Sequence, residues 1–407
     1  MANEISTDIP EQAEFRQKVR AWLEANTELK KAKSPWAVNF HTNDDAAQRE
    51  FENGRAMLKR LFDAGFTAFT YPKEYGGQGG PAWMESVFRE EASQYEVGTG
   101  FVSATIAMLA PTLMRHARAE QKAHYLPRLL SGEYGFCQLF SEPGAGSDLA
   151  GLGCRAVRDG DEFVVNGQKV WNSAAQWCNW GMLLARTDPD VPKHQGITFL
   201  LVDMSAPGIE ARPLVQATGA AHFNEVFLTD VRIPVANVVG EINGGWGPAR
   251  TVLSNESAFI GSGNQGSLHE KILMLARQFG KDSDPVIRQE IVRHYTRERL
   301  LGIMGERILT AVRRRETPPI DPSILKLYVA QNKVLSGNLV TSMAGPAGIA
   351  GDGEQALWMQ AELIGRYGIS IGGGTNEVQK NNLSERALGL PREPRIDQTV
   401  AWKDVPK

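Results

Sequence analysis

The sequence predicts an α+β protein in which a small, largely antiparallel β-domain interrupts two helical regions. Apolar residues recur at three- and four-residue spacing up to about residue 132, at two-residue spacing between about 135 and 240, and again at helical spacing from there to about 390. Helices, then strands, then helices is an α+β arrangement. We therefore expect an N-terminal helical domain over 1–133, a middle β-domain over 134–241 and a C-terminal helical domain over 242–407.

The first region begins with Phe15, Val19, Trp22 and Leu23, which would share one face of a helix. Three further stretches have the same spacing: 45–64, 82–96 and 119–130. Glycine and proline residues interrupt the helices at 71–81 (YPKEYGGQGGP).

In the middle region, the turn dipeptides Asp159-Gly160 and Asn166-Gly167 bracket DEFVV, and QKVW follows, which predicts a hairpin ribbon. Further short strands are expected at 180–186, 196–202, 208–213 and 222–232. Because no helical stretch between them is long enough for a crossover, the sheet should be largely antiparallel.

The C-terminal region starts after a glycine-rich turn at 240–247 and should form a bundle of four or five long helices. Its breaks are expected at Asp284-Pro285, 317–322, 345–353 and 372–374.

Composition excludes several classes of protein. The 407 residues are 42% apolar and 22% charged, which suits folded domains, and 44 basic against 47 acidic residues argue against a nucleic-acid binder. Apolar runs such as 196–202 are too short to span a membrane, and the acidic N-terminus shows no targeting signal. Three scattered cysteines suit reduced thiols in the cytoplasm, and the histidines lack metal-ligand spacing, so no metal site is expected.

The segment 138–151 (QLFSEPGAGSDLAG) follows a predicted strand and is rich in small residues. Gly144 and Gly146 permit close approach to backbone amides, and Ser141 and Ser147 add hydroxyl groups, so the segment is interpreted as a binding loop for an extended polar molecule. An ordinary turn at a sheet edge is the alternative for the loop taken alone.

This loop resembles the signature of the acyl-CoA dehydrogenase family, and four more segments resemble that family in the same order and at the same spacing. They are VNGQKVWNS (165–173), FNEVFLTDVRIP (223–234), ARQFG (276–280) and GGTNEVQ (373–379). The resemblance covers nearly the whole chain and implies bound FAD, with the flavin ring between the β-domain and the C-terminal helices.

The resemblance also implies which residues meet the flavin. Gln138, Phe140 and Ser141 match the strand that runs along the ring, Gly146 belongs to the loop after it, and Ser147 matches the serine at the substrate edge. Trp171 and Ser173 match an aromatic and hydroxyl pair beside the redox nitrogen, where hydrogen-bond donors stabilise the charge of the reduced ring. Without the resemblance, a core tryptophan on a strand is the alternative for Trp171.

Further contacts would come from a neighbouring subunit. Arg277, with Phe279, resembles the arginine that binds the FAD pyrophosphate, although the family arginine lies three residues before the phenylalanine and Arg277 lies two before it. The remaining matches are Gly345 and Gly348 on the adenosine half, and Thr375 and Glu377 after the last loop. The resemblance thus implies a homotetramer, or a heterotetramer with a related chain.

The family reaction needs a carboxylate base, and many members place it immediately before the last Gly-Thr, where this chain has Gly373. A second family arrangement puts the glutamate on the helix after the β-domain. There Glu256 shares one helical face with apolar and small residues, which points to a base whose pKa is raised by burial; a buried Glu satisfied by a polar neighbour is the alternative. The other residues on that face are Ala249, Val252, Leu253, Ile260 and Gly263.

Ser257 stands where relatives with that second arrangement generally have Arg. Gly373 is still expected to bind substrate, because the family uses the main-chain amide there to hold the thioester carbonyl. The run Arg313-Arg314-Arg315 reads as a solvated helix end, with CoA or another subunit as the alternative.

The leading functional hypothesis is an FAD-dependent acyl-CoA dehydrogenase that forms a trans-2-enoyl-CoA and passes electrons to an electron-transfer flavoprotein. The small residue at 373 would suit branched or bulky acyl groups, including steroid side chains or ring fragments. The alternatives are an FAD- or acyl-CoA-binding, non-catalytic subunit of a heteromeric acyl-CoA dehydrogenase, and a flavin monooxygenase of related fold.

Overall fold

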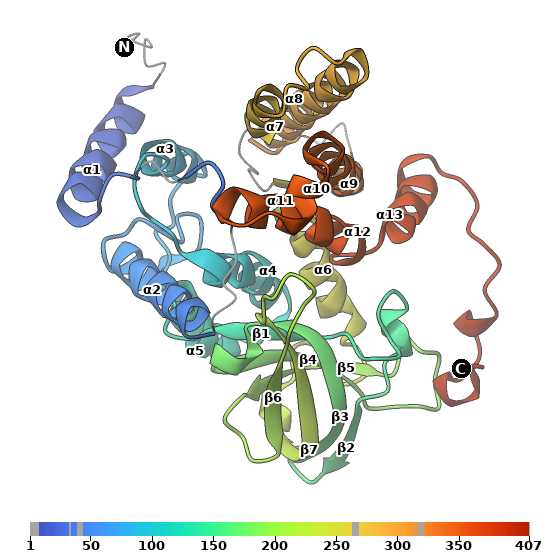
Figure 1. Ribbon diagram of the computed structural model, residues 1–407. Helices are drawn as coiled ribbons and strands as arrows, with labels where there is room; N and C mark the ends of the chain where they lie inside the picture. The colour runs from blue at the N-terminus through green and yellow to red at the C-terminus, as the bar shows by residue number, and fades with distance from the viewer. Residues whose placement is uncertain are drawn as a thin grey trace.

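The chain has a helix–sheet–helix architecture, as predicted. The computed structural model describes residues 8–31, 34–38, 44–262, 268–313, 316 and 321–406. In Figure 1 the N-terminal helices lie on one side of the molecule, the sheet lies below, and the C-terminal helices cover the top. The N-terminal helices are α1 (Pro10–Asn26), α2 (Asp44–Asp63), α3 (Trp83–Ala92), α4 (Gly100–His116) and α5 (Ala119–Leu130). Helix α3 ends four residues earlier than expected, and Tyr95 instead forms a β-bridge with Leu29.

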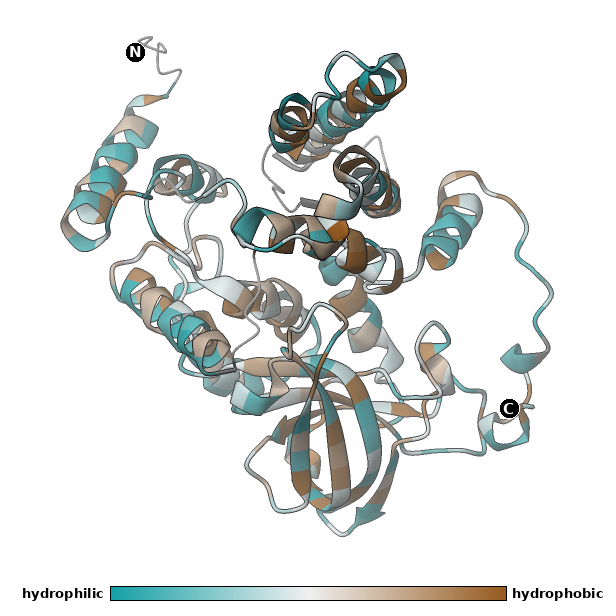
Figure 2. Cartoon of the chain, viewed as in Figure 1, coloured by the Kyte–Doolittle hydropathy of each residue, from teal (hydrophilic) through white to brown (hydrophobic). Residues whose placement is uncertain are grey.

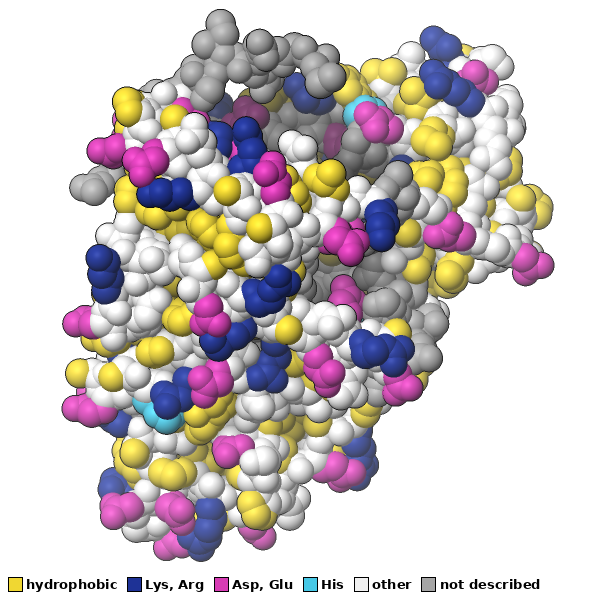
Figure 3. All heavy atoms as spheres, turned by 90° about the vertical axis from the view of Figure 1, so that its left-hand side faces the viewer, with side chains coloured by type: hydrophobic (Ala, Val, Ile, Leu, Met, Phe, Trp, Pro, Cys, Tyr) yellow, Lys and Arg dark blue, Asp and Glu magenta, His cyan; other side chains and the backbone are white. Residues whose placement is uncertain are grey.

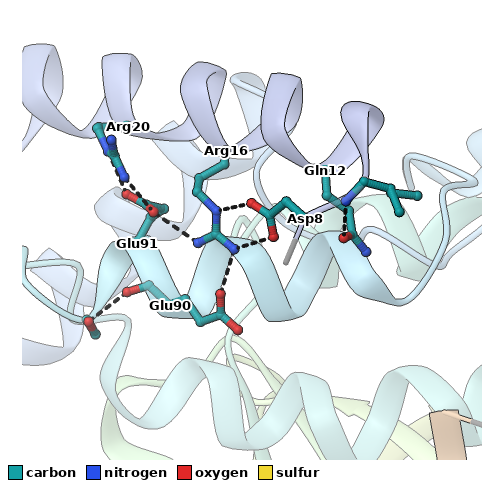
Figure 4. A network of polar contacts seen from close by, with 8 residues as sticks. Asp8, Gln12, Arg16, Arg20, Glu90 and Glu91 are labelled. Carbon is teal, nitrogen blue, oxygen red and sulfur yellow. Dashed lines mark hydrogen bonds and ion pairs between the residues drawn. The ribbon is translucent and has the colours of Figure 1, made fainter. Parts of the chain in front are cut away.

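A network of ion pairs joins α1 to α3 (Figure 4). The guanidinium of Arg16 bonds Asp8, Glu90 and Glu91 at 2.6 to 3.0 Å, and Arg20 bonds the same Glu91. Because one carboxylate serves two arginines on successive turns of α1, the network fixes the rotation of that helix against α3.

The middle domain is a seven-stranded sheet with the predicted short strands. They are β1 (Phe136–Leu139), β2 (Arg155–Asp159), β3 (Glu162–Ser173), β4 (Trp180–Arg186), β5 (Ile197–Asp203), β6 (Ile209–Leu214) and β7 (Phe223–Pro234). The order is β1-β4-β2-β3-β7-β6, with β5 paired to β4. The sheet is largely antiparallel, as expected, but β4 pairs in parallel with β1 and, at one position, with β2.

The prediction for Asn166-Gly167 was wrong. Strands β2 and β3 form the hairpin around Gly160, whereas Asn166 and Gly167 lie inside the single long strand β3, at a register shift against β7. A Cβ on Gly167 would lie 2.8 Å from Cys154, so the glycine is there for a close approach between neighbouring strands.

The core lies on both faces of the sheet. Along β4, Met182 and Leu184 pack against α4, α5 and α6, while Leu183 and Ala185 point into the opposite cluster. This alternation follows from the two-residue period of a strand. Bands of hydrophobic and hydrophilic residues along the strands are visible in Figure 2. The sheet is therefore packed on both faces, and helices α4, α5 and α6 cover one of them.

The C-terminal region forms a helical bundle with the predicted breaks at Pro285, 345–353 and 372–374. Its helices are α6 (Trp246–Ser262), α7 (Leu268–Gln278), α8 (Pro285–Arg313), α9 (Pro322–Ala344), α10 (Pro346–Ala350), α11 (Glu354–Gly365), α12 (Gly368–Ile371) and α13 (Asn376–Asn382). The predicted break at 317–322 falls mostly outside the described residues, as do Gly263, Arg314, Arg315 and the side chains of Ile260 and Arg313.

The tail after α13 leaves the bundle and returns to the β-domain (Figure 1). Trp402 donates its indole N–H to the carbonyl of Gly151, its ring lies 4.9 Å under the Arg186 guanidinium, and Lys193 bonds both Asp148 and Asp397. The tail therefore contacts the end of the segment 138–151, directly at Gly151 and through Lys193 at Asp148.

Two expectations concern the surface. Within the described chain, no helix has the length and apolar character needed to cross a membrane. On the face shown in Figure 3, acidic and basic side chains are interspersed, and no broad patch of one sign covers it.

Candidate active site

The Glu256 carboxylate lies where the first helix after the sheet crosses the first strand. Gln138 of β1 donates its side-chain amide to Glu256 Oε2 at 3.3 Å. One and two turns before it on α6, Val252 and Ala249 are fully buried in the core, and Leu253 packs against the same cluster. The apolar stripe predicted for α6 is thus present over its described residues, and it carries Glu256 against the sheet.

Burial dominates the electrostatics of this carboxylate. Desolvation raises the pKa of Glu256 above its ordinary value, while the hydrogen bond from Gln138 and the positive charge of Lys326 act in the opposite direction. A carboxyl group with a raised pKa is a better proton acceptor once ionised. The site therefore has the chemistry of a general base, held by a donor that favours its charged form.

A hydrogen bond connects Gln138 to the residue that follows Trp171, the aromatic residue predicted beside the flavin. Asn172 of β3 donates to the carbonyl of Gln138 at 2.7 Å. A register shift between Val170 and Asn172 places Trp171 at φ 63°, with 60% of its surface exposed. A left-handed tryptophan is strained, and the bulge turns its indole out of the sheet. Trp171 is thus not a core residue; Ser173 follows it at the end of the same strand.

The segment after β1 is held firmly in place. Glu142 and Ala145 bond each other's main chain in both directions, which closes a tight turn. The Glu142 carboxylate accepts the amides of Gly153 and Cys154 and an ion pair at 2.7 Å from the fully buried Lys169. This bracing leaves Gly146 and Ser147 exposed, so a ligand would meet a preformed loop.

Phe140 and Ser141 meet the sheet in different ways. The Phe140 ring is buried against Phe199, and its carbonyl accepts the Lys169 ammonium, so a ligand would meet only its main chain. Ser141 continues the strand, because its carbonyl accepts the amide of Val170.

The last glycine-rich turn is bonded to α9, and α9 packs against α6, the helix that carries Glu256. Gly373 and Gly374 adopt φ angles of 65° and 86°, and their carbonyls accept bonds from Gln379 and Lys326. Thr375 caps α13 by accepting the amide of Val378. Both φ angles favour glycine, which explains the pair in the sequence. Glu256 thus contacts Gln138 directly, and Lys326, whose charge acts on Glu256, ties in the Gly373-Gly374 turn.

The residues assigned to the other half of FAD form a separate group. Phe279 packs against the core between α7 and α11, and Gly348 is buried in α10 beside Met359. Arg277 is exposed, while Ala276, at the place of the family arginine, is fully buried. Within the described residues, no hydrogen bond or ion pair joins this group to Glu256. Gly345 lies between α9 and α10, and Glu377 projects from α13 with an exposed side chain.

Sequence reasoning missed Lys326 and Lys169. Lys326 is fully buried on α9, near the buried residues Leu325, Val329 and Ala330. A charged residue within a helical apolar stripe is the signal that marked Glu256, and it would have marked Lys326 too. Lys169 gave a weaker signal, because the bulge at Trp171 breaks the strand period next to it.

The described residues fit a bulky, planar, polar cofactor. The exposed indole of Trp171 offers a ring face, and the preformed loop around Ser147 offers hydroxyl and amide groups. The buried side-chain oxygens of Asn172, Asn376 and Gln379 accept no hydrogen bond in the described structure. Buried amide oxygens normally have donors, so a partner molecule with N–H or O–H groups fits both ends of the site. The described residues contain no cluster that could hold a metal ion.

This helix–sheet–helix arrangement is the fold of the acyl-CoA dehydrogenases, a class of flavin-dependent oxidoreductases. The chain belongs to the acyl-CoA dehydrogenase family, whose members typically bind FAD. Residues 9–133, 137–231 and 243–388 match the models of its N-terminal, middle and C-terminal domains.

Several relatives resemble the chain over nearly its full length. It is 35% identical to the acyl-CoA dehydrogenase IpdE1 of Mycobacterium tuberculosis, with 94% of this chain and 98% of IpdE1 covered. The structure of the Tcur3481-Tcur3483 steroid ACAD has a TM-score of 0.74 at 32% identity and covers 95% of this chain and 99% of that one. The ChsE4-ChsE5 complex from Mycobacterium tuberculosis has a TM-score of 0.70 at 28% identity, with 95% and 100% covered.

Proposed function

We propose that this chain catalyses the FAD-dependent α,β-dehydrogenation of an acyl-CoA thioester to the trans-2-enoyl-CoA, with Glu256 as the base. The observation that carries the proposal is the buried Glu256 carboxylate, which accepts a hydrogen bond from Gln138 on the strand assigned to the flavin. The membership of this chain in the acyl-CoA dehydrogenase family supports FAD as the oxidant.

In this reaction the α C–H bond breaks and its proton goes to Glu256, while the β hydrogen leaves with its electron pair and a C=C bond forms. Bound FAD would supply the acceptor for that hydrogen and electron pair. The amide of Gly373 would hold the thioester carbonyl, and so stabilise the negative charge that develops as the α proton leaves. Trp171 would cover the redox-active edge, and the preformed loop at Ser147 would line the substrate side.

The proposed FAD contacts come from this chain and from a neighbouring subunit. Gln138, Phe140, Ser141, Gly146, Ser147, Trp171, Ser173, Thr375 and Glu377 are the proposed contacts within this chain. Arg277, Phe279, Gly345 and Gly348 would contact the FAD of a neighbouring subunit. Because Arg277 is about 100° around the helix from Ala276, its guanidinium would approach the pyrophosphate from a different side than the family arginine.

The C-terminal helices carry the surface expected for that neighbour. Several large apolar side chains there are more than 45% exposed, namely Val286, Val292, Ile303, Ile349, Ile364, Tyr367 and Ile371. Exposed apolar groups of this kind are typical of subunit interfaces. We propose a tetramer of identical or related chains, with an electron-transfer flavoprotein as the electron acceptor.

The substrate class follows from the turn at 373. Gly373 and Gly374 would leave their wall of the substrate site without side chains, and a relative with 32% identity is described as a steroid ACAD. We therefore propose a branched or bulky acyl group, such as a steroid side chain or ring fragment. A substrate screen tests this: turnover restricted to straight short chains contradicts it.

The test of the base is anaerobic bleaching of the bound flavin by acyl-CoA. We expect bleaching by the wild-type protein and a fall of at least about 10³-fold in Glu256→Gln, which keeps the shape of the side chain but cannot accept the proton. Glu270→Gln, at an exposed position on α7, is the matched control and should bleach normally. Bleaching that survives in Glu256→Gln excludes Glu256 as the base.

A non-catalytic subunit is the second candidate function. Ser257 and Gly373 both depart from the common catalytic patterns, Ala276 replaces the family arginine, and one structural relative is a complex of two different chains. Purification of this chain alone and with its partner chain separates the two functions. A protein that binds FAD or acyl-CoA but bleaches only when the partner supplies its own carboxylate is a binding subunit.

A further inference from the structure

Lys326 is a fully buried cation in the same site as Glu256. It lies on α9, a helix that packs against α6, which carries Glu256, and against α13, which follows the last glycine turn. Its ammonium donates a hydrogen bond to the carbonyl of Gly374. A buried lysine is costly unless its charge and its donors have partners, so this one needs an explanation.

A second lysine on α9 provides a comparison. Lys333 bonds both carboxylate oxygens of Glu362 on α11, at 2.7 and 2.6 Å, and so forms an ordinary ion pair between helices. Lys326 has no such pair, because no carboxylate oxygen of the described residues lies within 4.0 Å of its nitrogen. Its hydrogen bond goes to a main-chain oxygen, and its charge is left to act on groups farther away.

The Lys326 charge interacts electrostatically with two carboxylates, Glu256 on α6 and Glu377 on α13. Burial lowers the pKa of Lys326 overall, and the charges of the two carboxylates offset only part of this. Two other charged residues on helices packed against α9 have partners of their own: Glu362 on α11 is paired with Lys333, and Arg297 of α8 bonds Gln331. Glu256 is more enclosed than Glu377, whose exposed side chain is screened by solvent, so the stronger partner of Lys326 is Glu256.

We propose that Lys326 is a positioning residue of the active site, which ties the Gly373-Gly374 turn to α9 and supplies a positive charge that favours the ionised form of Glu256. The proposal rests on the function proposed above for Glu256. It also accounts for Ser257, since the cation next to the base would come from α9 and not from the residue beside the glutamate.

Two variants separate the parts of this role. Lys326→Gln keeps a donor for the Gly374 carbonyl and removes the charge, whereas Lys326→Met removes both at similar volume. Lys333→Met, seven residues later on the same helix, is the matched control, since it breaks an ion pair outside the site. All are compared with the wild type in the holoprotein, with its partner chain if the two copurify.

The first readout is the pH profile of flavin reduction by acyl-CoA. We expect the acid limb of both Lys326 variants to move to higher pH, because the base loses a stabilising charge, and the rate on that limb to fall about tenfold for each unit of movement. Lys326→Met should also raise KM, because its turn is no longer tied, while Lys326→Gln should keep KM within about twofold. Lys333→Met should lower stability and leave the acid limb unmoved.

The second readout does not need turnover. The infrared carbonyl band of protonated Glu256, assigned by its disappearance in Glu256→Gln, is followed against pH in each protein. An upward shift of its midpoint in Lys326→Gln supports the proposal even if the wild type reduces no flavin, a result that would contradict the proposed function alone. A band midpoint and an acid limb that are the same in wild type and Lys326→Gln overturn it, and Lys326 is then only a structural tie.

Discussion

Gln138 Nε2 donates a hydrogen bond across 3.3 Å to Glu256 Oε2, and this bond joins the first strand of the sheet to the first helix after it. Two residues 118 positions apart in the sequence thus share a polar contact. A donor aimed at a carboxylate favours its charged form, so the strand partly offsets the effect of burial on Glu256.

Replacement of Gln138 should therefore make Glu256 harder to ionise. In Gln138→Met the carboxylate loses its donor while burial is unchanged, so the pKa of Glu256 rises further and the acid limb of flavin reduction moves to higher pH. The rate well above that limb should change little. Gln48→Met, which removes an exposed amide on α2, should leave the profile as in the wild type; identical profiles for all three proteins would refute the coupling.

The buried pair of Lys169 and Glu142 should be a major source of stability for the loop. Lys169→Met leaves the Glu142 carboxylate with only its two amide donors, so we expect a loss of about 3 kcal/mol in the free energy of unfolding. Urea unfolding measures this. Lys380→Met, which removes an exposed cation from α13, should cost less than about 0.5 kcal/mol; equal losses in the two variants would contradict the assignment.

The Gly373-Gly374 turn should tolerate no side chain at its second position. In Gly374→Ala the new Cβ would combine a φ of 86° with a contact of 2.8 Å to Gln379 Nε2, so we expect a loss of about 2 kcal/mol and weaker binding of enoyl-CoA. Gly389→Ala has a similar φ of 66° and open space around the Cβ, and therefore isolates the backbone strain. Chemical unfolding of both variants makes the comparison, and a Gly389 variant as unstable as the Gly374 variant would count against the contact.

The C-terminal tail should restrain the end of the segment 138–151. Trp402→Ala removes the bond to Gly151 and the stacking on Arg186, so we expect about 1 to 2 kcal/mol less stability and faster proteolysis after Arg392 and Arg395. Trp402→Phe keeps a ring and should lose only part of this. Cleavage rates that match the wild type in the Ala variant would show that the tail is held elsewhere.

The contact between α1 and α3 should weaken in acid. Burial raises the pKa of Glu91, but its bonds to Arg20 and Arg16 outweigh this and lower it overall. A carboxyl group whose pKa is depressed by folding contributes stability above its unfolded value, near pH 4.3, and loses that contribution as the pH falls through the folded value. Hydrogen exchange in α1 should thus accelerate below about pH 4, and Glu91→Gln should show fast exchange already at pH 7. Slow exchange in that variant at pH 7 would contradict the role of the network (Figure 4).

The sequence determined the architecture through local periodicity, and it proposed the base candidate through the family resemblance together with the apolar stripe around Glu256. The two-residue spacing of 180–186 and 196–202 became β4 and β5 almost to the residue, since these strands are buried on both faces and nothing competes with them. Glu256 stood out because it interrupts an apolar stripe on a single helix, a pattern that needs no knowledge of what the helix meets.

Only the tertiary structure decided what each charge faces. Asn166-Gly167 reads as a turn but lies inside β3, because the close approach of Cys154 requires a glycine there. Gln138, Glu256 and Lys326 come from β1, α6 and α9, and no spacing in the sequence relates them. Desolvation and charge depend on distances in space, so the protonation of Glu256 is a property of the packed domains and not of any one segment.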